Sequence, residues 1–203
     1  MKKYAVLHEP GDIVTLAGTR FVVLDVERRG SLPDSLFLLA LESVGASEFG
    51  SSNNYAESDL KKAVDKWLED MGKRGLDNAK LIPREIDLTT LDGSGCYGKL
   101  SVKAAPLTLD EAREYADIIP NAERWCWLAT GWSGPSKSDG GYALYVDSGG
   151  NWFGGSCSVS GGIRPALKIP SDLLLDSADK PDLSEVPTDT LLEEIRRRVV
   201  DKA

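Results

Sequence analysis

A stretch rich in glycine and tryptophan constrains the fold of this chain more than any other feature. The 41 residues from 125 to 165 contain 10 of the 20 glycines and four of the five tryptophans. Their charged residues are few: Lys137, Asp139, Asp147 and Arg164. Glycine allows tight turns, and tryptophan supplies contact area with little conformational entropy to lose. This composition predicts short strands joined by shaped loops.

The aromatic residues of this stretch fall into two groups. Three lie in strand-like sequence, where aromatic side chains are most often buried, and these are Trp125, Trp127 and Tyr145. Three others stand beside glycine and serine in turn-like sequence, and these are Trp132, Trp152 and Phe153. Because exposed apolar groups mark contact surfaces, the second group is predicted to touch a ligand.

The first 45 residues predict β structure. Apolar runs at 4–7, 13–16, 21–26 and 36–41 are separated by turn sequences such as Pro10-Gly11-Asp12. Short strands joined by tight turns would form a small meander. A further short strand is expected at 99–102.

Two helices are predicted in the middle of the chain. The first has Ser58 as its N-cap and Gly72 as its stop, and its apolar side chains recur at helical spacing: Leu60, Val64, Trp67, Leu68 and Met71. The second opens at Thr108, where Glu111 completes a capping box, and runs toward Pro120. Both helices are interpreted as scaffold. Strands and helices together predict the α+β class.

The C-terminal tail differs from the rest of the chain. We expect one domain over residues 1–175, followed at 176–203 by a linker and an amphipathic helix. The apolar side of that helix carries Leu191, Leu192, Ile195 and Val199. Because so short a helix is marginal alone, it is expected to dock on its own domain or on another copy, which would make a homo-oligomer.

The overall composition is that of a globular protein and excludes several functions. The 203 residues include 24 Lys or Arg and 32 Asp or Glu, so the net charge is −8. Nucleic-acid binding requires a dense basic surface, whereas the basic run here is limited to Arg196–Arg198. The chain has no apolar run of about eighteen residues and no signal-peptide core. We therefore expect no nucleic-acid partner, no membrane span, and a cytoplasmic or virion-associated location.

The residues that usually carry catalysis or bind metals are scarce. His8 is the only histidine, which excludes zinc and iron sites that need two or more imidazoles. Cys96, Cys126 and Cys157 are odd in number and far apart, so neither a zinc ribbon nor a disulfide framework is indicated. No metal and no cofactor are expected. Cys126 stands between two tryptophans, with no nearby group that would lower its pKa.

Two short motifs have a structural explanation as well as a functional one. Gly93–Gly98 matches the dinucleotide pattern G-x-G-x-x-G, which requires a following helix, but a strand is expected next. A glycine-rich turn is preferred there. Asp147–Asn151 offers oxygen ligands to calcium, yet it contains one carboxylate, so a hairpin turn is preferred and calcium stays as the alternative.

The order of several motifs resembles an uncharacterised domain family that is widespread in gut Firmicutes and their phages. The N-terminal half of the resemblance lies in Gly11–Val14, Phe21–Asp25, Asn53–Tyr55, Ser58–Leu60 and Trp67-Leu68. The C-terminal half lies in Trp125–Gly131, Ala143–Gly150 and the closing Gly162-Ile163-Arg164-Pro165-Ala166-Leu167. The similarity covers residues 4 to 170, and the Gly-Ile-Arg-Pro element is its most specific part.

This resemblance implies a C-type-lectin-like mixed fold of short antiparallel strands, shared with formylglycine-generating-enzyme relatives, sulfoxide-synthase relatives and the variable proteins of diversity-generating retroelements. In the retroelement proteins the segment before the Gly-x-Arg motif is hypervariable and binds proteins or cell-surface ligands. The chain departs from the enzymes, because the close cysteine pair and the three-histidine iron site are both missing. The calcium-placing motifs of sugar-binding lectins are missing too.

The function expected from this comparison is a non-enzymatic ligand- or protein-binding domain. The resemblance implies these contact residues: Trp132, Ser133, Ser136, Tyr142, Asn151, Trp152, Phe153, Ser156 and Ser158. Trp127 and Arg164 are assigned structural roles, with the Arg164 guanidinium donating to backbone carbonyls and locking the last strand. Two alternatives stay open: a structural phage or host assembly component, and an enzyme of unknown reaction that uses Cys126 or Cys157.

Overall fold

The computed structural model describes residues 2–4, 8–29, 32–137 and 140–177, which form a mixed α+β structure. The first strands are β1 (Lys2–Tyr4), β2 (Ile13–Leu16), β3 (Thr19–Arg29), β4 (Leu32–Ala40) and β5 (Ala46–Glu48). The middle of the chain forms α1 (Asp59–Lys73), β6 (Arg84–Asp87), β7 (Lys99–Val102), β8 (Ala104–Ala105) and α2 (Leu109–Glu114). The last strands are β9 (Cys126–Gly131), β10 (Tyr142–Val146), β11 (Trp152–Ser156), β12 (Ser160–Gly162), β13 (Ala166–Pro170) and β14 (Leu174–Ser177). Short 3₁₀ turns occur at Tyr55–Glu57 and Asn78–Lys80.

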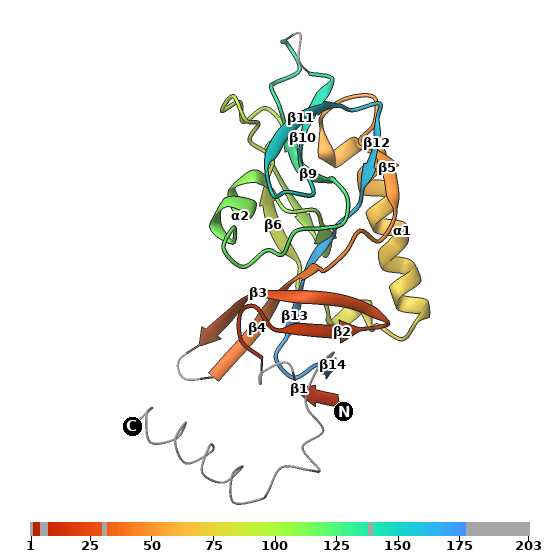
Figure 1. Cartoon of the computed structure of the whole chain (residues 1–203), viewed down its shortest axis with the longest axis vertical. Coiled ribbons are helices and arrows are strands. Elements are labelled where there is room, and N and C mark those ends of the chain that lie inside the picture. Colours follow the sequence, from red (N-terminus) through yellow and green to blue (C-terminus); the bar gives the residue numbers. More distant parts are fainter. Residues whose placement is uncertain (1, 5–7, 30–31, 138–139, 178–203) are drawn as a thin grey trace, which may run out of the picture.

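The described strands form three sheets that are mostly antiparallel. The largest has the order β1-β14-β2-β3-β4-β13-β8, and the second has the order β11-β10-β9-β12-β5. β6 and β7 form a separate pair. In Figure 1, β1 to β4 lie at the lower end of the molecule and the β9 to β11 strands lie at the upper end. β13 pairs with β4, and Gly162 of the preceding β12 pairs with Cys126 of β9, so the segment between them links the two ends.

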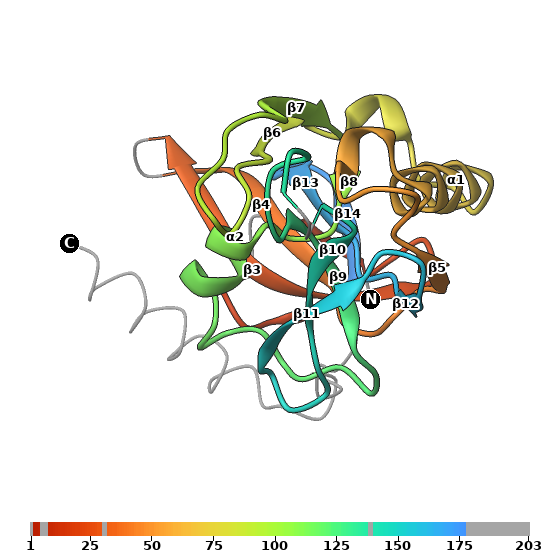
Figure 2. The ribbon, with the colours of Figure 1, turned by 90° about the horizontal axis from the view of Figure 1, so that it is seen from above.

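The central strands β3 and β4 are buried on both faces. One cluster of buried side chains joins Phe21 and Leu38 to α1, whereas a second joins Val22 and Leu39 to α2. The two helices lie at opposite sides of the molecule (Figure 2). The N-terminal part of the chain therefore supplies the inner strands β2, β3 and β4 of the large sheet. The continuous apolar runs of β3 and β4 are explained by cover on both faces.

The first helix begins as expected and ends later than expected. The Ser58 Oγ accepts the backbone N–H of Lys61 at 2.9 Å, which is the predicted N-cap. Gly72 does not stop the helix, which continues to Lys73. The stop is Gly75, whose φ of +101° favours glycine. The N–H of Leu76 then returns to the carbonyl of Met71 at 3.1 Å, which completes a Schellman motif.

The second helix has the predicted start but is shorter than predicted. The Thr108 side chain accepts the N–H of Glu111, and the Glu111 side chain accepts the N–H of Thr108, which is the capping box. The helix ends at Glu114, well before Pro120. The N–H groups of Ile118 and Ile119 both return to the carbonyl of Tyr115, so tight turns replace the expected last turns of helix.

The terminal strands lie side by side in the large sheet. β14 pairs with β1, and its last residues pair with β2, so the sheet extends to Ser177, two residues beyond the expected domain boundary. Of the strand expected at 4–7, Tyr4 is the last residue of β1, and residues 5–7 lie outside the described part of the chain. The amphipathic helix expected in the tail also lies outside the described residues.

Neither α1 nor α2 has the length and apolar character that crossing a membrane requires.

Candidate functional site

The exposed large apolar side chains of the described residues gather around one end of the molecule. They are Leu91, Trp132, Tyr142, Trp152, Phe153 and Val159, each 37–49% exposed. Five of them belong to the segment that runs from the end of β9 to the start of β12, and the sixth, Leu91, donates its N–H to the carbonyl of Gly131. Clustered exposed apolar groups are a signature of contact surfaces.

The register of β10 and β11 separates these side chains onto two faces. Tyr142 pairs with Ser156, and Trp152 pairs with Val146, so alternation places Tyr142, Trp152 and Ser156 on the same face. Trp132 joins this face because its ring covers Gly154, which stands between Trp152 and Ser156. We call this surface, formed by Trp132, Tyr142, Trp152, Gly154 and Ser156, the aromatic face.

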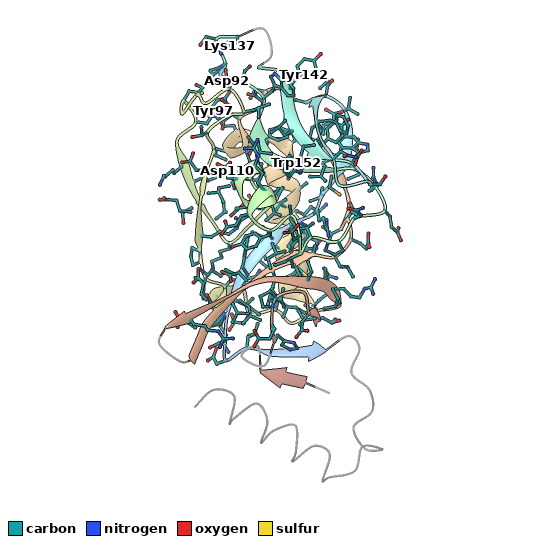
Figure 3. All side chains as sticks on the ribbon, turned by 60° about the vertical axis from the view of Figure 1, so that its left-hand side comes forward. Asp92, Tyr97, Asp110, Lys137, Tyr142 and Trp152 are labelled. Atoms are coloured by element: carbon teal, nitrogen blue, oxygen red, sulfur yellow. The ribbon has the colours of Figure 1, made fainter. Side chains whose placement is uncertain are left out.

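Two contacts hold the tryptophans of the aromatic face in place. A Cβ atom at Gly154 would lie 2.3 Å from the Trp132 ring, so only glycine lets the ring lie flat on the strand. The guanidinium of Arg113, from α2, lies over the Trp152 ring at 5.6 Å from its centroid. Figure 3 shows Tyr142 near the upper end and Trp152 lower.

The opposite face of the hairpin continues the aromatic core. Phe153 lies 5.8 Å from Tyr145 between ring centroids, and Tyr145 lies 4.8 Å from Trp125. The ring centroids of Trp125 and Trp127 are in turn 4.9 Å apart. The Trp127 indole N–H donates to the carbonyl of Ser47 at 3.1 Å. Trp127 is buried, as its structural assignment requires, whereas Trp125 and Tyr145 are half-buried. Phe153 is therefore separated from Trp132 and Trp152.

A buried asparagine, which sequence reasoning did not single out as a site residue, anchors the loops behind the aromatic face. Asn53 has no exposed surface, and its Nδ2 donates to the carbonyls of Ser133 at 2.8 Å and Tyr142 at 3.0 Å. Its Oδ1 accepts the hydroxyl of Tyr97 at 2.6 Å. Gly131 leaves room for it, because a Cβ there would lie 2.9 Å from Asn53. Asn53 follows two serines and precedes a second asparagine, so its position in the sequence offered no local sign of these long-range bonds.

An ion pair fastens the loop that follows Trp132. The Lys137 ammonium lies 2.6 Å from Asp92, and both side chains are seen at the upper end in Figure 3. Hydrogen bonds from Lys137 and from the Thr90 hydroxyl lower the pKa of Asp92 to about 2. The Gly93–Gly98 segment follows Asp92 in the connection between β6 and β7, and it leads into β7, not into a helix. It is a turn without the helix N-terminus that dinucleotide binding needs.

The remaining predicted contact residues differ in exposure. Ser133 is 2% exposed and belongs to the interior beneath the aromatic face, so it is corrected from a contact residue to a buried one. Ser136 and Ser158 are exposed, and the Ser156 and Ser158 hydroxyls lie 2.9 Å apart. Asn151 is exposed but donates its N–H to Asp147 within the turn between β10 and β11.

The Asp147–Asn151 turn is a hairpin connection. The Asp147 Oδ1 accepts the N–H groups of Asn151 and Gly149, each at 2.8 Å, and the bond from Asn151 is the main reason that the pKa of Asp147 is lowered. Gly150 has a φ of +84°, as the reversal of the chain requires. In the described part of the chain, no three His, Cys, Asp or Glu residues come together as metal ligands would.

The two buried cysteines have the electrostatics of inert thiols. Burial raises the pKa of Cys157 to about 12. Burial also raises the pKa of Cys126, although the charges of Arg164 and Arg124 act in the opposite direction. Reactive cysteines need the thiolate, which these environments disfavour. Cys96, by contrast, is exposed.

We therefore expect the three thiols to differ in reactivity. With a disulfide reagent at about pH 8, exposed Cys96 should react quickly, and Cys157 at least about 100-fold more slowly, since a pKa of about 12 leaves about one Cys157 thiol in ten thousand ionised. Cys126 should also react more slowly than Cys96, because it is buried and burial raises its pKa. Replacement by Cys96→Ser should remove the fast phase, while Cys157→Ser should leave it unchanged. A fast phase that survives Cys96→Ser would contradict this expectation and favour the enzyme alternative.

The site thus consists of three exposed rings: Trp152 on the edge strand β11, Tyr142 on β10, and Trp132, which packs over Gly154 of β11. Asn53 and the Asp92–Lys137 pair hold the loops behind them. Arg164 lies deeper, where its Nε donates to the carbonyl of Ala40 at 2.7 Å, the type of backbone contact expected for it. The chain matches no protein-family model, no curated protein and no solved structure. Any inference about its function therefore rests on its own sequence and geometry.

Proposed function

We propose that this chain is a non-enzymatic binding domain whose ligand contacts the aromatic face. The observation that carries the proposal is the gathering of exposed large side chains at one end, where Trp132 and Trp152 are already held by Gly154 and Arg113. Tryptophan and tyrosine are the residues that most often dominate binding energy. Rings that are positioned before binding lose little entropy when a partner arrives.

The proposed fold family is the C-type-lectin-like one, and the proposed partner is another protein or a cell-surface ligand. The mixed structure, with antiparallel strands and two helices, supports a scaffold of this kind. The aromatic face comes from residues 132–156, between scaffold strand β9 and the buried Arg164. In the retroelement proteins that the sequence resembles, this is the segment that varies and binds. A fold alone does not determine a function, so the proposal depends on the site.

The enzyme alternative has less support. The pKa of Cys157 is raised to about 12 and that of Cys126 is also raised, both chiefly by burial, so neither thiol has the character of a nucleophile. The assembly alternative depends on the tail, which lies outside the described residues. It differs from the proposal in one respect that can be measured: it makes the aromatic face dispensable.

The decisive experiment compares the two faces of the β10–β11 hairpin. The labelled chain is incubated with intact bacterial cells from the source community, and binding is measured by flow cytometry. We expect Trp132→Ser with Trp152→Ser to weaken binding at least tenfold, since one interface tryptophan commonly contributes about 2 kcal/mol or more. Phe153→Ser removes a still more exposed ring from the opposite face and should leave binding within about twofold of the wild type.

Equal binding by the wild type and the double variant would contradict the proposal and favour assembly through the tail. A loss that is larger for Phe153→Ser would place the contact surface on the other face.

Substitution counts per codon across many isolates supply an independent test of diversification. We expect changes to concentrate between codons 132 and 160, and an even distribution would remove the retroelement interpretation while leaving a fixed ligand open.

A further inference from the structure

A cavity of about 80 Å³ lies between α2 with its following loop, strand β9 and the β10–β11 turn. Its walls are mainly apolar, with Leu107, Ala112 and Ile119 on one side and Leu128 and Val146 on the other. Trp152 and Asp147 also line it, beside the aromatic face. One water molecule needs roughly 10–15 Å³ of such space, so the cavity admits a ligand of about five to eight non-hydrogen atoms.

Arg164 is the positive charge in the wall of this cavity. Its side chain is 7% exposed, and its Nε donates a hydrogen bond to the carbonyl of Ala40. Its Nη2 is buried and has no hydrogen-bond partner among the described residues. A buried charge without a hydrogen-bonded counter-ion is costly to a folded protein.

The second buried arginine differs from Arg164 in having a carboxylate partner, although its own Nε is also buried without a hydrogen bond. Arg84 is 8% exposed, and its Nη1 pairs with the carboxylate of Glu111. Its Nη2 donates to the carbonyls of Ala105 at 3.0 Å and Pro106 at 3.1 Å. Arg164 has no such carboxylate within the described part of the chain. The difference points to a counter-ion that the chain itself does not supply.

The acidic side chains near Arg164 accept hydrogen bonds from backbone N–H groups and not from the guanidinium. The Glu42 carboxylate accepts the N–H of Glu123 at 3.2 Å, and Asp147 accepts N–H groups of its own turn. Burial lowers the pKa of the Arg164 guanidinium, and the nearby Cys126 and Glu42 oppose this only in part. Arginine nevertheless stays protonated in proteins, so the cavity retains its positive charge.

We propose that this cavity binds a small monocarboxylate with an apolar body of about two to four carbon atoms, whose carboxylate pairs with the Arg164 guanidinium. Hydrogen bonds between a guanidinium and a carboxylate are charge-assisted, so the Arg164 guanidinium favours a carboxylate over a neutral acceptor. The apolar walls contact the carbon chain, and the volume sets its length. This site goes beyond the proposed function and shares Trp152 alone with the aromatic face.

The test measures binding of butanoate to the full chain by calorimetry and by NMR. Butanamide is the matched neutral probe, because it has the same shape and lacks the charge. We expect saturable binding of butanoate and at least tenfold weaker binding of butanamide. Equal binding of butanoate and butanamide would overturn the proposal. So would the absence of saturable binding of acetate, propanoate and butanoate up to about 50 mM, a concentration at which weak binding of small ligands is still detected.

Variants keep the test independent of folding. Ala116 lines the cavity and is exposed, so Ala116→Phe should occupy the space, leave Arg164 in place and weaken butanoate binding at least tenfold. Ala79→Phe is the matched control, since Ala79 is an exposed alanine that does not line the cavity. Butanoate binding that survives Ala116→Phe unchanged would show that the carboxylate binds elsewhere. Trp132→Ser should leave butanoate binding intact, which separates this site from the aromatic face.

Discussion

The substitution Glu111→Ala is expected to lower the free energy of unfolding by about 3–4 kcal/mol, one of the largest losses for a single side chain here. Glu111 is the carboxylate partner of Arg84, and the Arg84 side chain is 8% exposed. The guanidinium carbon of Arg84 also lies 5.1 Å from the centroid of the Phe37 ring. Removing the carboxylate leaves that guanidinium charged and buried. The same substitution removes the acceptor of the Thr108 N–H at 2.8 Å and so half of the capping box.

The control for this prediction stands one residue earlier. Asp110 is 89% exposed and lies 3.4 Å from Arg113, so Asp110→Ala should cost less than about 0.5 kcal/mol. Urea unfolding at neutral pH measures both. Replacing the pair together, as Arg84→Met with Glu111→Met, should restore much of the stability, because no charge is then stranded. Equal losses for Glu111→Ala and Asp110→Ala would show that the buried pair does not stabilise the fold.

Asn53→Ala is expected to lower the free energy of unfolding by about 3 kcal/mol, since buried polar groups that lose their partners cost about 1–3 kcal/mol each. The Ser133 carbonyl would lose its bond from Asn53, while the Tyr142 carbonyl would keep the N–H of Trp132 at 2.9 Å. The Tyr97 hydroxyl would lose its acceptor. Urea unfolding, followed by tryptophan fluorescence, gives the change.

Asn54→Ala is the matched control for Asn53→Ala. Asn54 is half-buried, and its Oδ1 accepts one bond, from the N–H of Ala56 at 3.1 Å. Its loss should cost about 1 kcal/mol or less. If the two variants are equally stable, the three bonds of Asn53 are not what holds the loops. Asn53→Ala should also weaken cell binding, because the backbones that carry Trp132 and Tyr142 are then less firmly held.

Several elements could be predicted because their signals are local. Ser58 and Thr108 cap their helices through side-chain bonds to backbone groups three residues away, which sequence spacing reveals directly. The Asp147–Asn151 hairpin turn has the same short range. The end of α1 was misplaced because two glycines, Gly72 and Gly75, follow each other closely, and only the backbone conformation distinguishes the glycine that reverses the chain.

The candidate site was predicted only in part. Composition identified Trp132 and Trp152 as exposed, and both are. It did not separate Phe153 from them, because the face on which a strand residue lies depends on register, and the register is set by pairing between strands. Ser133 was placed at the surface although it is buried. No pattern in the sequence distinguished it from Ser136.

Local chemistry along the chain was sufficient for the α+β class, the helix starts, the hairpin turn and the exposure of two tryptophans, because each depends on residues a few positions apart. Tertiary structure alone brought Glu111 to Arg84 and Asn53 to Ser133, across 27 and 80 residues. It also left Arg164 in the wall of an apolar cavity, with no carboxylate paired to it among the residues that the structure describes. Such pairings are decided by how the whole core packs, and a charge that packing leaves unpaired becomes visible only when every neighbour is in place.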